Sequence, residues 1–263
     1  MIVNKTLIRE LAKQGKRINM RSLTEYRKPI TIETNISWTA EGSAKVQIGQ
    51  TVVLAGVKLA IEKPYNDTPS EGGIMVNAEL VPLSSSEYEP GPPGPKAVEL
   101  ARVTDRGIRE AKAVDMKKLC IKSGEKAWFV TIDLITINDD GNLFDAVGLA
   151  ALAALKAARF PVVDQKTGAI DYKQKTEEPL PLLKEPLPVT IYKVNNELLV
   201  DPTWEEENAY EARLTVSADK DGTISALQKG GEGPLTISEV AKMVDLALEK
   251  AEFLRVELDK AFE

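Results

Sequence analysis

Residues 77–121 of this 263-residue chain, NAELVPLSSSEYEPGPPGPKAVELARVTDRGIREAKAVDMKKLCI, carry most of the information about its fold. The stretch opens as the end of a strand and then breaks in a segment rich in serine, proline and glycine, residues 84–95. Such residues favour turns and end regular structure. Pro95 suits the first turn of a helix, which the pattern predicts over residues 96–114.

Three arginines recur along this predicted helix at positions i, i+4 and i+7, namely Arg102, Arg106 and Arg109. Planar guanidinium groups on one helical face can bind successive phosphates. The alternative is pairing within the helix, because an acidic residue lies three or four positions from each arginine. These acids are Glu99, Asp105 and Glu110. The spacing leaves both interpretations open. The apolar side of the helix is expected to carry Val98, Ala101 and Ile108.

Strand patterns precede and follow this stretch, and each series of strands ends in a helix. The first half has predicted strands at 29–36, 41–49, 51–62, 74–83 and 126–139, with a hairpin turn at Gly49–Gln50. An alanine-rich helix at 143–160 is apolar all round and should be buried. Shorter strands at 188–196, 197–203, 210–219 and 222–230 lead to a final helix at 236–262. The fold class is therefore α/β or α+β with mixed sheets.

The final helix carries the clearest start signal, because Thr236 and Glu239 form a capping box. Its apolar stripe consists of Val240, Met243, Ala247, Ala251, Leu254 and Leu258. We divide the chain into four parts: an N-terminal helix and arm at 1–28, a first domain at 29–160, a linker or surface excursion at 161–186, and a second domain at 187–263.

Composition excludes several kinds of chemistry. The chain has no histidine, so nucleophile schemes that depend on a histidine base are impossible. The single cysteine, Cys120, cannot form an internal disulfide and is expected to be a small buried apolar residue. A net charge of −6 argues against nonspecific wrapping of nucleic acid but allows a local basic face. Without a continuous apolar span, we expect a cytoplasmic protein with no membrane contact.

The acidic run at Glu205, Glu206 and Glu207 raises the question of an active site or a metal site. Oxygen ligands suit magnesium. Three consecutive glutamates cannot all face one ion from a regular strand or helix, however. A solvated turn is therefore the favoured interpretation of the run, and no metal site is predicted.

Residues 77–121 resemble the RNase PH family. The phrases EGSAKVQIGQTVVLAGVKLAIEKPYNDTPSEGG (41–73), DDGNLFDAVGLAALAAL (139–155) and VDPTWEEENAYEARL (200–214) support this resemblance, which extends over about residues 20–255. Their order is similar to that in the non-catalytic ring subunits of the archaeal exosome. The resemblance implies the RNase PH fold of two related βαβα-like halves, with mixed sheets and packed helices. It also implies a hexameric ring of three heterodimers with a catalytic paralogue, under a cap of RNA-binding subunits.

Active members of the family degrade RNA from the 3′ end by phosphorolysis, in which inorganic phosphate attacks the terminal linkage. Their motif EEDxxGEAD supplies two aspartates, and the matching positions here are Glu207 and Arg213. Arginine cannot act as the acid. The phosphate-binding loop is replaced by Asp140-Gly141-Asn142-Leu143-Phe144, and a TRR-like arginine pair by Ala101-Arg102-Val103. The resemblance therefore implies a catalytically inactive subunit that binds no cofactor. Inorganic phosphate, with or without magnesium, would be used at the partner's site.

By the same resemblance, Arg102 and Arg106 match positions that hold RNA leading into the neighbouring active site. Arg109 lacks this support and is expected either to join them or only to pair with Asp105. We therefore predict a non-catalytic exosome ring subunit that binds single-stranded RNA. The alternatives are an active phosphorolytic exoribonuclease that uses Glu207, or a purely structural spacer. One departure concerns the N-terminal family phrase RxDGR, whose glycine is replaced by Met20.

Overall fold

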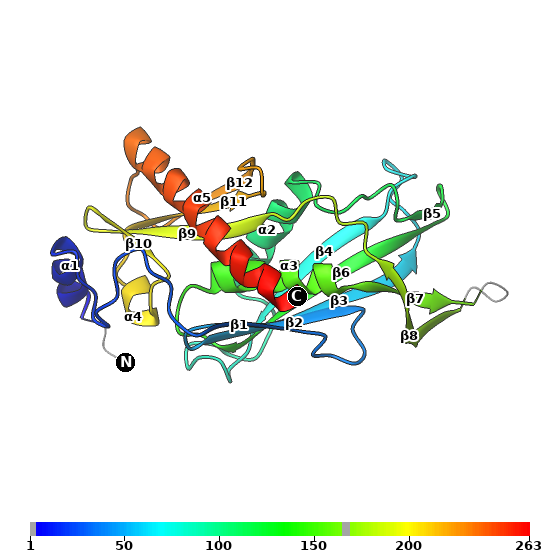
Figure 1. Cartoon of the computed structure of the whole chain (residues 1–263), viewed down its shortest axis with the longest axis horizontal. Coiled ribbons are helices and arrows are strands. Elements are labelled where there is room, and N and C mark those ends of the chain that lie inside the picture. The colour runs from blue at the N-terminus through cyan, green and yellow to red at the C-terminus, as the bar shows by residue number, and fades with distance from the viewer. Residues whose placement is uncertain (1–3, 165–168) are drawn as a thin grey trace.

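Helix α3 (Leu143–Ala157) lies between two β-sheets in the computed structural model, which describes residues 4–164 and 169–263 (Figure 1). Every residue of α3 except Lys156 is buried, as its alanine-rich sequence predicts. The helix packs closely on both sides. A Cβ at Gly148 would lie 2.0 Å from Cγ of Pro188, and a Cβ at Gly42 would lie 2.2 Å from the Ala154 carbonyl oxygen. Glycine at both places is what lets the helix approach each sheet.

The first sheet is mixed and has the strand order β1-β2-β3-β6-β4, with β5 added beside β6. Its strands are β1 (Ile30–Thr34), β2 (Gly42–Ile48), β3 (Thr51–Glu62), β4 (Gly73–Leu80), β5 (Cys120–Lys122) and β6 (Lys126–Asn138). Only β4 and β6 pair in parallel. The predicted hairpin turn joins β2 to β3, and Gly49 has a φ of 60° there. Cys120 is half-buried rather than buried, because β5 is short and lies at the end of β6.

The second sheet is antiparallel, with the order β10-β9-β11-β12. Its strands are β9 (Leu187–Val194), β10 (Glu197–Val200), β11 (Ala212–Ala218) and β12 (Ile224–Gly230). Helix α5 (Ile237–Asp259) crosses β9 and β11, and a 3₁₀ turn (Lys260–Phe262) follows it. The predicted capping box at Thr236 and Glu239 is confirmed. Five residues of the predicted stripe are buried, and Val240 is partly buried against the same core.

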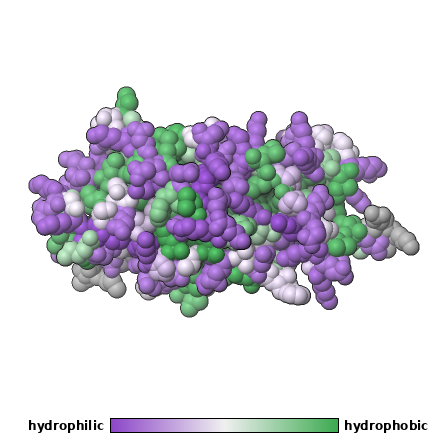
Figure 2. All heavy atoms as spheres, in the orientation of Figure 1, coloured by the Kyte–Doolittle hydropathy of each residue, from purple (hydrophilic) through white to green (hydrophobic). Residues whose placement is uncertain are grey.

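A two-stranded sheet of β7 (Arg159–Val163) and β8 (Ile170–Pro179) extends from one end of the molecule (Figure 1). Its strands occupy residues 161–163 and 170–179 of the segment 161–186 for which we expected a linker or surface excursion. Residues 165–168 of that segment, like residues 1–3 of the N-terminal part, lie outside the described residues. The face in Figure 2 is mostly hydrophilic, with small apolar patches between the charged side chains. None of the described helices is both long and apolar enough to cross a lipid bilayer.

The N-terminal part consists of helix α1 (Lys5–Lys13), capped by Asn4, and an arm that leads to β1. Where the family phrase has glycine, Met20 has a φ of 62° and its side chain is 88 % exposed. The backbone therefore keeps a left-handed turn although the glycine is lost. The arm continues through Arg17 and Arg27, which are both buried.

Candidate nucleic-acid interface

Helix α2 (Pro95–Glu110) begins at Pro95, as predicted, and packs against β4, β12 and α3. Its buried residues are Ala97, Leu100, Val103, Thr104, Gly107 and Ile108. The predicted apolar side is therefore only partly correct: Ile108 is buried, Ala101 is half-buried, and Val98 is 45 % exposed. The helix contacts elements on more than one side. Its buried side is therefore the one that carries Leu100 and Gly107, not the one that carries Val98.

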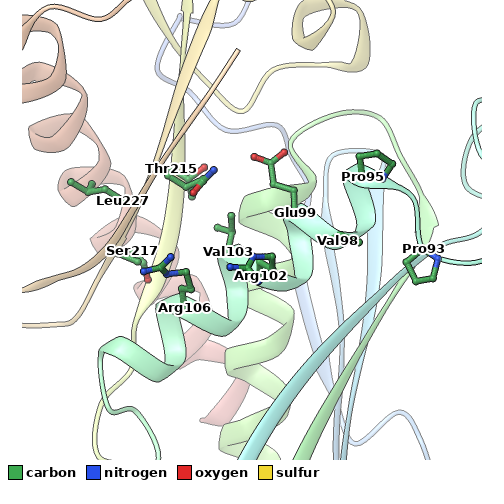
Figure 3. A pocket seen from close by; sticks show the side chains of 12 residues that line it. Pro93, Pro95, Val98, Glu99, Arg102, Val103, Arg106, Thr215, Ser217 and Leu227 are labelled. Atoms are coloured by element: carbon green, nitrogen blue, oxygen red, sulfur yellow. The ribbon is translucent and has the colours of Figure 1, made fainter. Parts of the chain in front are cut away.

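A groove of about 640 Å³ lies between α2 and strands β11 and β12; we call it the α2 groove (Figure 3). It is lined by Pro93, Pro95, Val98, Glu99, Arg102, Val103, Arg106, Thr215, Ser217, Ala226, Leu227 and Gln228. Arg102 and Arg106 are exposed on its α2 side. Within residues 4–164 and 169–263, neither guanidinium has a hydrogen bond or an ion pair. The α2 groove therefore presents two positive charges without internal partners.

The pairing alternative holds only for the third arginine of α2. Arg109 binds Asp105 with an Nη2–Oδ1 distance of 2.6 Å and also donates to the carbonyl oxygen of Ile74 at 2.8 Å. Glu99, which could have paired with Arg102, instead binds Arg213. The three arginines thus share a helix face, but Arg109 is already paired whereas Arg102 and Arg106 have no partner among the described residues.

A second cavity of about 270 Å³, which we call the acidic hollow, lies on the other side of Glu99. It is lined by Glu87, Lys96, Glu99, Phe144, Trp204, Glu207, Asn208, Tyr210 and Arg213. The structure thus brings Glu207 and Arg213 together in one cavity. Sequence reasoning missed Lys96, Glu99 and Phe144 as members of this cavity. No local spacing identifies them, because α2 and α3 are far in the chain from Glu207 and Arg213.

Arg213 on β11 is held inside the acidic hollow. Its Nη2 atom lies 2.6 Å from Oε1 of Glu99, and its guanidinium carbon lies 4.1 Å from the ring centre of Phe144. Burial opposes its charge, but Tyr192 and Glu99 outweigh this and raise the pKa of Arg213. The residue is therefore a fixed cation that has no proton to give at any ordinary pH.

Glu207 and Lys96, two further charged groups of the acidic hollow, also have internal partners. Glu207 accepts a hydrogen bond from the hydroxyl of Tyr192 at 2.7 Å. Lys96 lies 3.1 Å from Asp139 and 4.0 Å from Glu207. Burial opposes its charge, but these two carboxylates raise the pKa of Lys96, so it stays protonated. Both cations of the acidic hollow, Arg213 and Lys96, are therefore paired with carboxylates.

The interpretation of residues 205–207 as a solvated turn is wrong. They belong to the short helix α4 (Trp204–Glu207), which has its own capping box between Thr203 and Glu206. Glu206 is 2 % exposed and forms an ion pair with the buried Arg17. Arg17 comes from the N-terminal arm, which the local sequence of the run cannot reveal. Among the described residues no cluster of three or more acidic or cysteine side chains is arranged to hold a metal ion.

The loop before α3 is filled by internal hydrogen bonds. Arg27 donates to the carbonyl oxygen of Gly141 at 3.0 Å and to Oδ2 of Asp140 at 2.8 Å. Asn142 has a φ of 57°, and its side-chain amide donates to Asp145 and Asp201, at 3.0 Å each. Most polar groups of the loop are therefore bound within the chain, but Oδ1 of Asn142 is buried without a hydrogen-bond partner among the described residues.

Asp145, in the first turn of α3, is the most perturbed acid near this loop. Burial raises its pKa to about 7, although hydrogen bonds from Asn142, Tyr26 and Thr190 act in the opposite direction. The carboxyl joins the N-terminal arm, α3 and β9. It is therefore part of the packing between the two sheets and lies outside the lining of both cavities.

Two sheets thus enclose a buried helix, and the α2 groove, whose two arginines have no partner in the described part of the chain, lies beside the acidic hollow, whose Arg213 and Lys96 are paired. The chain belongs to the 3′ exoribonuclease (RNase PH) family, whose domain 1 matches residues 26–161 and whose domain 2 matches residues 184–250. It is 44 % identical to the exosome complex component Rrp42 of Methanothermobacter thermautotrophicus over 98 % of this chain and 95 % of the relative. It is 48 % identical to Rrp42 of Thermococcus gammatolerans over 94 % of this chain and 91 % of the relative.

The chain is also similar to solved structures of archaeal exosome chains. The chain superposes with a TM-score of 0.88 and 42 % identity on a chain of the Archaeoglobus fulgidus exosome with RNA bound to the active site, covering 96 % of both chains. It superposes with a TM-score of 0.84 and 40 % identity on a chain of an archaeal exosome core, covering 97 % of this chain and 96 % of the other. The RNase PH fold expected from the sequence is thereby confirmed.

Proposed function

We propose that this chain is a non-catalytic ring subunit of an archaeal exosome. In this role it binds single-stranded RNA through Arg102 and Arg106 and leads the 3′ end to the active site of a catalytic RNase PH-like partner. The observation that carries the proposal is that both arginines are exposed in the α2 groove without an internal partner. Cations in this state are free to bind phosphates.

The absence of catalysis is proposed from the chemistry of the acidic hollow. Phosphorolysis needs cationic groups around the attacking phosphate and an acid for the leaving oxygen. Arg213 occupies the position that matches the acid and is bound to Glu99. Glu207 accepts the Tyr192 hydroxyl. Neither residue is placed to donate a proton to a leaving group.

The remaining parts of the proposal concern the assembly. The partner is a catalytic RNase PH-like paralogue in a hexameric ring of three heterodimers, with RNA-binding cap subunits above the ring. Inorganic phosphate, and magnesium where the partner needs it, act at the partner's site. RNA is held by its backbone, so binding is independent of base sequence, and the terminal linkage is positioned for attack. Cellular RNA as substrate implies a cytoplasmic location.

The deciding experiment measures nucleoside diphosphate released from a short 3′-tailed RNA in the presence of phosphate and magnesium. The pure chain should release none, whereas the chain mixed with its catalytic paralogue should be active. Phosphate-dependent release by the pure chain would show that it is an enzyme and overturn the proposal.

A second experiment separates an RNA-binding subunit from a structural spacer. The double variant Arg102→Ala/Arg106→Ala should assemble normally but bind RNA roughly 10- to 100-fold more weakly, because charge-assisted contacts to phosphate are lost. Its plot of log affinity against log salt should be shallower by about 1.4, at about 0.7 per phosphate contact. The matched control is Arg109→Ala on the same helix, where Asp105 already binds the arginine. Unchanged affinity in the double variant at several salt concentrations would favour the spacer.

A further inference from the structure

Strand β12 lies at an edge of the second sheet and has an open outer side. The two edges of this sheet differ. At β10 the N-terminal arm covers the edge, and the Val200 amide donates to the Leu23 carbonyl oxygen at 2.9 Å. Along β12, no strand of residues 4–164 and 169–263 pairs with the outer side. A strand edge of this kind can pair with a strand of another chain.

The side chains of β12 give this edge little protection. Natural edge strands are commonly guarded by charged residues or by proline. Strand β12 has no proline and a single charged residue, Lys229, near its end. Ile224 is 38 % exposed, and Leu227 is 51 % exposed. Apolar side chains are therefore left in water next to an open strand edge.

These apolar side chains and the α2 groove lie on opposite faces of the sheet. Thr215 and Ser217 line the groove, so Val216 between them faces α5. Leu227 pairs with Val216 and therefore shares its face; its side chain turns away from α2 in Figure 3. Helix α5 packs over β9 and β11 and leaves Leu227 half exposed beyond them. The edge of β12 thus separates the groove from an exposed apolar surface.

The proposed RNA path requires the catalytic partner to lie close to this edge. Arg102 and Arg106 are one helical turn apart, about 5.4 Å along the axis, so they hold only neighbouring phosphates. The partner must therefore adjoin the α2 groove, whose walls are α2 and the strands β11 and β12. The other sides of α2 are packed against β4 and α3, whereas β12 is the last strand of its sheet. Of these walls, β12 is the one that is open on its outer side.

We propose that β12 is a contact surface for the catalytic RNase PH-like partner. A strand of the partner pairs with the outer side of β12, and an apolar part of the partner covers Leu227 and Ile224. The partner then lies beside Arg102 and Arg106, where it can receive the RNA that they hold. This inference rests on the proposed function and assigns the surface through which the two subunits meet next to the RNA path.

The first test identifies what lies against β12. A photo-crosslinking amino acid replaces Leu227 in the chain assembled with its catalytic paralogue, and mass spectrometry identifies the crosslinked peptide. The matched control is the same replacement at Val256, an apolar residue of α5 that is 50 % exposed. Position 227 should crosslink to the catalytic paralogue, and position 256 should not. No crosslink from position 227, or a crosslink only to a second copy of this chain, would overturn the proposal.

The second test introduces a charge into the same surface. Leu227→Lys and Leu227→Glu alter an exposed side chain, so the isolated chain should keep its circular dichroism spectrum and melting temperature. Assembly with the paralogue, followed by analytical ultracentrifugation, should need a roughly 10- to 100-fold higher concentration, because an unpaired charge is buried in the contact. Val256→Lys should assemble as wild type. Wild-type assembly of both Leu227 variants, or an equal loss in Val256→Lys, would overturn the proposal.

RNA degradation separates this inference from the proposed function. Degradation by the Leu227→Lys complex should recover as the protein concentration is raised, because its defect lies in assembly. Degradation by the complex that contains Arg102→Ala/Arg106→Ala should not recover in this way. If the Leu227 variants assemble normally and the double arginine variant still binds RNA weakly, the contact surface is wrong and the RNA-binding function stands. If the double arginine variant binds RNA as wild type does, the proposed function itself fails.

Discussion

The acidic hollow and the α2 groove adjoin each other at Glu99, which lines both, yet their charges are treated in opposite ways. In the acidic hollow, Arg213 is bound to Glu99 and Lys96 to Asp139. In the α2 groove, Arg102 and Arg106 have no partner among the described residues. A charge with an internal partner holds the fold together, whereas a charge left without one keeps its capacity for a ligand. The family resemblance alone cannot show which charges have internal partners.

Glu99 also connects the charges of the two cavities. Glu99 is three residues from Arg102, a spacing at which an ion pair within the helix is possible. Arg213 binds Glu99 at 2.6 Å and so keeps this carboxylate occupied. Arg213 thus holds a carboxylate of α2 that could otherwise pair with Arg102.

The largest expected effect comes from breaking a buried pair behind the acidic hollow. Arg17→Met removes the close ion-pair partner of the buried Glu206 and leaves it with Arg21 at 4.0 Å, and the free energy of unfolding should fall by about 3–5 kcal/mol. Urea denaturation followed by circular dichroism measures this. The control Lys16→Met changes an exposed neighbour, and Arg106→Met changes an unpaired cation of the groove. The free energy of unfolding of both should stay within about 0.5 kcal/mol of the wild type. A large loss of stability in Arg106→Met would show that this arginine has an internal partner.

The next effect tests the connection through Glu99. Arg213→Met should lower the free energy of unfolding by about 1–2 kcal/mol, because the contacts with Phe144 and the partly exposed Glu99 are lost. The assembled complex should also bind RNA a few-fold more weakly, since Glu99 becomes free to pair with Arg102. Adding Glu99→Gln should restore RNA affinity but not stability. Equal RNA affinity in wild type and Arg213→Met would show that Glu99 does not reach Arg102.

A pH-dependent effect is expected from Asp145, whose folded-state pKa is raised by burial to about 7. Between its ordinary pKa near 4 and about 7, the folded chain holds a proton that the unfolded chain has released. The contribution of this group to stability is therefore greatest at low pH and is lost as pH rises through this window, by at most about 1.4 kcal/mol per pH unit.

The test for Asp145 compares urea midpoints of the wild type and Asp145→Asn at several pH values from 5 to 8. The variant cannot titrate at this position, so its stability should fall less steeply with pH than that of the wild type, whatever its absolute stability. Parallel curves for the two proteins would show that Asp145 is ionised throughout this range.

The smallest effect concerns the left-handed turn at Met20. Met20→Gly should raise the free energy of unfolding by about 0.5–1 kcal/mol, because relief of the strain at a φ of 62° outweighs the greater flexibility of glycine when unfolded. The exposed side chain contributes little packing that would be lost. The comparison variant Met20→Ala keeps the strain and should not be stabilised; a gain in Met20→Ala equal to that in Met20→Gly would point to the side chain instead.

Much of the fold could be predicted from local patterns. Strand β3 occupies residues 51–62 as predicted, and the buried helix α3 and the capped helix α5 follow from alanine-rich and periodic sequence. The errors occur where a distant element decides burial. Val98 is exposed because the elements packed against α2 cover its other sides. Glu206 is buried because the N-terminal arm covers it.

The sequence by itself determined most of the longer helices and strands, the place of the arginines on α2, and the absence of histidine chemistry, because these depend on residue type and near-neighbour spacing. Only the tertiary structure decided which charges have partners. Arg17 and Glu206 are 189 residues apart, and Glu99 meets Arg213 only because α2 packs against the second sheet. An ion pair requires contact within a few ångströms, and for residues distant in the chain that contact is set by the fold alone.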